Sequence, residues 1–112
     1  MNIQIYCGKK NFDVQKAERY FRERRIAYQL LDLKKHKLGE REVRLMVSAV
    51  GMEQILDRDN PKVRENPACY FDRAEMLVAA IQEEPWLLRT PVVRNGNRMT
   101  VGYKPETWET WQ

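Results

Sequence analysis

The residues best placed for chemistry lie near the N-terminus, in a loop between a short predicted strand and the start of a helix. This loop contains Cys7, Lys9, Lys10 and Asn11. The free N–H groups and the macrodipole at a helix start stabilise an anion, and they lower the pKa of a thiol placed there. A redox protein would therefore carry its cysteines at the helix start, but this chain has Asn11 and Val14. An amide has no ionisable nucleophile, so the usual covalent chemistry is absent from this position.

Cys7 precedes Asn11 by four residues, and the sequence leaves two interpretations of it open. If it faces the loop, Lys9, Lys10 and the helix dipole lower its pKa and make it a catalytic thiol. If it faces the core, it is a small buried hydrophobe. The second cysteine, Cys69, follows Pro67 in the middle of the chain and is predicted to be a partly buried thiol. A Cys7–Cys69 disulfide stays open, because sequence separation says nothing about spatial distance.

Lys9 and Lys10 also form a candidate site for a small anion, since they lie beside a helix N-terminus. Asn11 then has two interpretations, as the N-cap of the helix or as an amide that binds a ligand. The single histidine, His36, is predicted to be an isolated surface residue in a basic loop. With two distant cysteines and one histidine, the chain lacks the ligand spacing of a metal site, and none is expected.

The composition fits one domain over residues 1–112 and excludes several classes of protein. The net charge of +4 is too small, and the acidic residues too evenly interspersed, for a dedicated nucleic-acid binder. No apolar run is long enough to cross a membrane, and the N-terminus lacks the pattern of a secretory signal. We therefore expect a cytoplasmic protein with reduced cysteines, no direct contact with nucleic acid and no membrane association.

The hydrophobic periodicity predicts an α/β fold that begins with a parallel strand–helix–strand unit over residues 2–33. Asn11 or Asp13 caps the first helix, which runs to about residue 25. A helical insertion over about 38–85 follows, in which Gly51 ends one helix and starts another and Asp72 caps the last helix. A hairpin over 90–103 turns at Asn95-Gly96. The predicted sheet is mixed and four-stranded, with the first strand and the first hairpin strand at its centre. Trp86, Trp108 and Trp111 are interpreted as core or groove-lining residues, the last two on a final helix.

The order of these elements, together with particular residues, resembles the arsenate-reductase (ArsC) and Spx family of thioredoxin-like proteins. The residues that carry the resemblance are Ile5-Tyr6, Gln15-Lys16-Ala17, Ile26–Leu33, Arg58, Pro85–Val93 and Val101-Gly102-Tyr103. The resemblance implies a thioredoxin-like fold with a cis peptide at Thr90-Pro91, which faces the loop over 7–13.

The resemblance also implies what an active member would need. Family arsenate reductases attack the arsenic oxyanion with a cysteine at the helix start, complete the reduction with glutathione and glutaredoxin, and bind the oxyanion with arginines. Here the nucleophile position is Asn11. The arginine usually found before the cis-proline is Thr90, with Arg89 one residue earlier, and the arginine after the last-strand glycine is Tyr103. Arg58 matches its family position.

Two functions from different classes therefore remain. The first is an ArsC/Spx-like binding or regulatory module that is redox-inactive at the helix start and has no cofactor. Its protein partner is unidentified, and RNA polymerase is implied only by the resemblance to Spx. The second is an oxidoreductase that uses Cys7, with glutathione as cosubstrate. A small oxyanion or glutathione is a further candidate ligand. The candidate binding residues, for an anion or a partner, are Lys9, Lys10, Asn11, Arg58, Arg89, Thr90 and Pro91.

Overall fold

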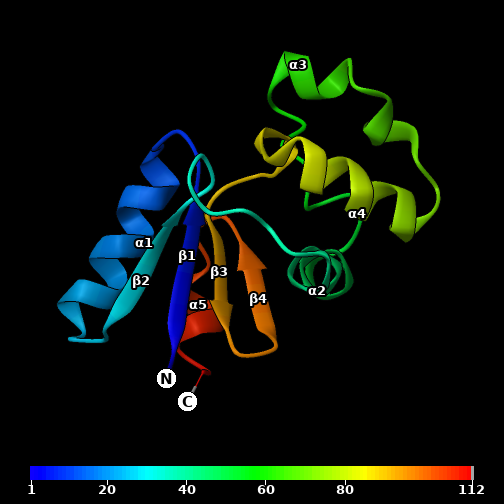
Figure 1. Ribbon diagram of the computed structural model, residues 1–112. Helices are drawn as coiled ribbons and strands as arrows, with labels where there is room; N and C mark the ends of the chain where they lie inside the picture. Colours follow the sequence, from blue (N-terminus) through cyan, green and yellow to red (C-terminus); the bar gives the residue numbers. More distant parts are fainter. Residues whose placement is uncertain (112) are drawn as a thin grey trace.

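A four-stranded mixed sheet forms the centre of the protein in the computed structural model, which describes residues 1–111. The strands are β1 (Ile3–Cys7), β2 (Tyr28–Asp32), β3 (Val92–Asn95) and β4 (Arg98–Val101), in the spatial order β2-β1-β3-β4 (Figure 1). β1 pairs in parallel with β2 and antiparallel with β3, and β3 pairs antiparallel with β4. The predicted topology is confirmed, with β1 and β3 as the central pair.

Helices cover both faces of this sheet. They are α1 (Phe12–Glu23), α2 (Glu40–Val50), α3 (Pro61–Arg64), α4 (Ala74–Glu83) and α5 (Pro105–Trp108), with short 3₁₀ turns at η1 (Pro67–Tyr70) and η2 (Pro85–Leu87). One hydrophobic cluster joins α1 and α5 to one face of the sheet, and a second joins the opposite face to the insertion. In Figure 1 the insertion lies beside the β4 edge of the sheet, away from α1.

Aromatic packing holds the α1 side together. Trp108 is buried, and its ring lies 5.1 Å from the ring centroid of Tyr20 and 5.0 Å from that of Phe21. The indole N–H of Trp108 donates to Thr100 Oγ1 on β4 at 2.8 Å, so the polar atom of this core residue is satisfied. Trp111 is buried in the same cluster. It lies beyond α5, which ends at Trp108, so the prediction that the two indoles share the last helix is wrong.

The insertion departs from the predicted helices in two places. No helix begins directly at Gly51. The chain makes a single turn, closed by the N–H of Ile55 donating to Gly51 O at 3.1 Å, and Leu56 then forms an antiparallel β-bridge with Leu88. The N–H of Asp57 donates to Leu87 O and the N–H of Arg89 to Ile55 O, both at 2.9 Å, and these tertiary bonds replace the intrahelical ones. The N-cap of α4 is Arg73 rather than Asp72, because it is Arg73 O that accepts the first helical bond, from Leu77.

A polar cluster ties the insertion to the sheet. The Glu42 carboxylate on α2 accepts hydrogen bonds from Tyr6 Oη at 2.5 Å and from the N–H of Gly39 at 3.1 Å. His36 Nε2 lies 2.9 Å from the same carboxylate, so the prediction of an isolated surface histidine is wrong. Burial, and next the hydrogen bond to Glu42, raise the pKa of Tyr6 to about 12, so this phenol stays a donor. Arg94 Nη1 donates to the same phenol oxygen at 3.4 Å.

Glu42→Gln is expected to lower the free energy of unfolding at neutral pH by about 1–3 kcal/mol, because a hydrogen-bonded charge is lost. Burial alone would raise the pKa of Glu42, but hydrogen bonds from Tyr6, Gly39 and His36 hold it below its ordinary value of 4.5. The contribution of the Glu42 carboxylate to the free energy of unfolding is therefore full above pH 4.5. It is lost as the pH falls through the lowered pKa of Glu42 in the folded state. Urea unfolding of both proteins at pH 7 and at about pH 3 tests this. An equal difference in the free energy of unfolding between wild type and Glu42→Gln at both pH values would contradict this prediction.

Candidate functional site

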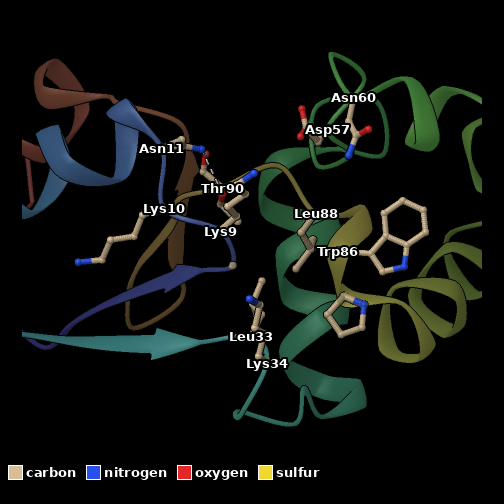
Figure 2. Close-up of a pocket in the computed structure, with 12 residues that line it drawn as sticks. Lys9, Lys10, Asn11, Leu33, Lys34, Asp57, Asn60, Trp86, Leu88 and Thr90 are labelled. Carbon is tan, nitrogen blue, oxygen red and sulfur yellow. Dashed lines mark hydrogen bonds between the residues drawn. The ribbon is translucent and has the colours of Figure 1, made fainter.

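The side-chain amide of Asn11 joins the start of α1 to the segment before β3. Its oxygen accepts the N–H of Val14 at 2.8 Å, which makes Asn11 the N-cap of α1. Its nitrogen donates to the Thr90 carbonyl at 3.1 Å and lies 3.3 Å from Thr90 Oγ1 (Figure 2). The Thr90-Pro91 peptide is cis, as the resemblance implied. Both ends of this amide thus have partners within the fold.

Cys7 ends β1 and faces the protein interior, with only 3 % of its surface exposed. Burial raises the pKa of its thiol, the carboxylates of Asp32 and Glu18 raise it further, and Lys10 opposes them only in part. The effect is opposite to the activation of a nucleophilic cysteine, and it favours the interpretation of Cys7 as a buried hydrophobe.

The two cysteines are both free thiols, so the disulfide left open by the sequence is not formed. Cys69 lies half-buried in η1, where its thiol donates to Val63 O at 3.0 Å. Among residues 1–111, no group of three or more His, Cys, Asp or Glu side chains could hold a metal ion.

The Asn11–Thr90 contact separates the basic residues that the sequence proposed as one anion site. Lys9 and Lys10 line a large groove on one side of it. Arg89 lines a shallow groove on the other side, where the other charged side chains are the carboxylates of Asp13, Asp57 and Asp59. Because these acids outnumber Arg89, this second groove is a poor site for an oxyanion.

The remaining family positions serve the fold. The guanidinium of Arg58 donates to the carbonyl oxygens of Glu53 at 3.1 Å and Cys69 at 3.5 Å, so it braces the insertion and lines neither groove. Tyr103, at the position of a family arginine, packs edge-on against Trp108 with ring centroids 5.6 Å apart. Lys16 on α1 lies 5.7 Å above the Tyr103 ring.

The large groove lies between the loop over 8–11 and the start of the η2–β3 segment, with a volume of about 700 Å³. Figure 2 shows loop 8–11 and the end of β2 on one side, with Trp86 and Leu88 on the other. Its apolar lining consists of Leu33, Pro85, Trp86 and Leu88, and its polar lining of Gly8, Lys9, Lys10, Asn11, Lys34, Asp57, Asn60 and Thr90.

Sequence reasoning did not identify several of these lining residues as part of a site. For one of them, Lys34, the sequence does contain the information needed. This lysine lies two residues past the end of β2, the second strand of a parallel pair, and the carboxyl ends of parallel strands meet at the same edge of a sheet. Lys34 therefore belongs beside the loop that follows β1. Trp86 was predicted only as a core or groove-lining residue, and the structure places it in the groove.

The family model of the ArsC family matches residues 6–111. The chain belongs to the ArsC family. Among curated proteins, none matches the chain. Within residues 1–111, the structure contains no helix with the length and hydrophobicity needed to span a membrane.

Solved structures show the same fold. An arsenate reductase (ArsC) related protein from Brucella melitensis is 25 % identical with a TM-score of 0.71, and the match covers 99 % of this chain and 94 % of that one. The protein YffB (PA3664) is 24 % identical with a TM-score of 0.79, over 96 % of both chains. The arsenate reductase of Vibrio cholerae is 18 % identical with a TM-score of 0.79, over 96 % of this chain and 94 % of that one. Together they confirm the thioredoxin-like fold of this ArsC-family chain.

Proposed function

We propose that this ArsC-family domain works as a binding or regulatory module, without thiol chemistry, and takes up its ligand in the large groove. The observation that carries the proposal is the bonding of Asn11. At the position where a family nucleophile would stand, the amide caps α1 and bonds to Thr90. Both roles are structural, so this residue preserves the architecture of the active-site loop without its reactive group.

The geometry argues against the alternative function, an oxidoreductase that uses Cys7. A thiol reacts as its thiolate, and burial together with nearby carboxylates disfavours that form of Cys7. A reductase of this family would also need arginines around its oxyanion. Arg58 is engaged with backbone carbonyls, while Arg89 lies among carboxylates. No specific observation favours catalysis at Cys7.

An enzyme assay with glutathione and glutaredoxin tests the proposal. Reduction of arsenate and of a glutathione mixed disulfide is measured for wild type and Cys7→Ser, with an active arsenate reductase as positive control. We expect both proteins to give only the rate seen without them, because neither presents a thiolate at the helix start. Wild-type turnover that disappears in a correctly folded Cys7→Ser variant would refute the proposal.

A further inference from the structure

We infer that the large groove binds a segment of a partner protein in which an apolar side chain is flanked by acidic ones. The inference rests on the proposed function and specifies its ligand. It comes from three properties of the groove: its apolar lining, the two lysines on one of its walls and the aromatic side chains exposed around it.

The apolar lining of the groove indicates a ligand larger and less polar than a small anion. At about 700 Å³, the groove has the volume of a site for a drug-sized ligand. Leu33, Leu88 and Trp86 line it, and covering this surface needs an apolar group on the ligand. Trp86 is 45 % exposed, whereas Trp108 and Trp111 are buried. The exposed indole is thus available to a ligand.

The charges of the groove favour an acidic partner. Lys9 and Lys34 line the groove, and neither has an ion-pair partner within the described residues. Lys10 is already engaged, because its ammonium lies 3.4 Å from Glu18 and points away from Trp86 (Figure 2). The carboxylate among the lining residues is that of Asp57. Acidic side chains placed toward Lys9 and Lys34 would therefore complement the groove.

Two exposed aromatic residues indicate that the ligand is a protein segment. Phe12 is 78 % exposed and lines the shallow groove beyond Asn11 and Thr90, while Trp86 is exposed in the large groove. Exposed aromatic side chains beside a groove are typical of protein–protein interfaces. A nucleic-acid strand fits less well, because among residues 1–111 the groove offers one exposed ring, Trp86, on which successive bases could stack, and two unpaired lysines, Lys9 and Lys34, for its phosphates.

Binding is tested with acetyl-Glu-Asp-Leu-Phe-Asp-Glu-amide, followed by the emission of Trp86 and by the anisotropy of a fluorescein-labelled copy. We expect saturable binding that weakens with salt. Lys9→Glu/Lys34→Glu should weaken it at least about tenfold. The matched control, Arg19→Glu/Arg98→Glu, makes the same charge change at exposed residues outside the groove and should leave the affinity unchanged. Trp86→Phe should remove the emission change while the anisotropy change remains.

Several results of these binding measurements would overturn the inference. An amide version of the peptide, with Gln and Asn for Glu and Asp, must bind at least about tenfold more weakly. Equal binding of the two peptides, or equal binding by the control and groove variants, would refute an acidic ligand. Lys9- and Lys34-dependent binding of glutathione or of an oligothymidine, without peptide binding, would refute a protein ligand. These results leave the proposed function standing, whereas Cys7-dependent turnover refutes that function and not the peptide measurement.

Discussion

Asn11→Cys is expected to create a thiol that iodoacetamide alkylates on the order of 100-fold faster than Cys7. The new thiol would stand at the N-cap of α1, next to the first free N–H groups of the helix. The helix dipole and these donors lower a thiol pKa, whereas burial raises that of Cys7. The variant also loses the bond from Val14 N–H to the Asn11 side chain, which should cost about 1 kcal/mol of stability.

Alkylation is followed by mass spectrometry of the intact native protein and of its peptides. Asn11→Ser is the matched control, because serine caps a helix about as well as asparagine and adds no thiol. It should be labelled as slowly as the wild type. If the thiol introduced at position 11 reacts no faster than Cys7, the loop does not have the electrostatic character of an active-site loop, and the family position assigned to Asn11 is wrong.

Trp108→Ala is expected to destabilise the protein by about 3–5 kcal/mol, a large part of the stability of a small domain. The indole is buried between the aromatic rings of Tyr20 and Phe21, and it bonds to Thr100. Its loss leaves a cavity in the cluster that attaches α1 and α5 to the sheet, together with an unpaired Thr100 hydroxyl.

Urea unfolding followed by far-UV circular dichroism measures this effect. Trp86→Ala is the matched control, because it removes the same side chain from a site that is 45 % exposed, and it should cost less than about 1 kcal/mol. A loss at Trp108 as small as that predicted for Trp86 would show that Trp108 is not the anchor of the α1–α5 core. A loss at Trp86 as large as that predicted for Trp108 would show that Trp86 belongs to the core rather than to the groove.

Most of the fold follows from local signals in the sequence. Each of three elements follows from one local pattern: β1 from the alternation in residues 2–6, α1 from the apolar face of Val14, Ala17 and Phe21, and the hairpin from the Asn95-Gly96 turn. The sequence also predicts β1 and β3 as neighbours, as the sheet order shows. The errors lie where tertiary bonds override local preference. Residues after Gly51 have a helical pattern, but Leu56 pairs with Leu88 instead.

The candidate site was harder to predict, because it depends on which way side chains face. Lys9 was predicted from its place beside the helix N-terminus, and Arg89 from its place next to a family arginine position. The Asn11–Thr90 contact nevertheless puts them in different grooves. The burial of Cys7 was one of two open interpretations, and its place in the interior depends on the pairing of β1 with both neighbours. His36 looked isolated because Glu42, six residues later, reaches it only when α2 has formed.

The central claim is that this domain does no thiol chemistry. The most direct test of it is the labelling of Cys7 in the native wild-type protein. Iodoacetamide labelling at increasing urea is read by mass spectrometry, with the half-buried Cys69 as internal reference. We predict that Cys69 is modified in the native protein and Cys7 only at urea concentrations that unfold the sheet. Alkylation of Cys7 in the native state, as fast as that of Cys69 or faster, would contradict the claim.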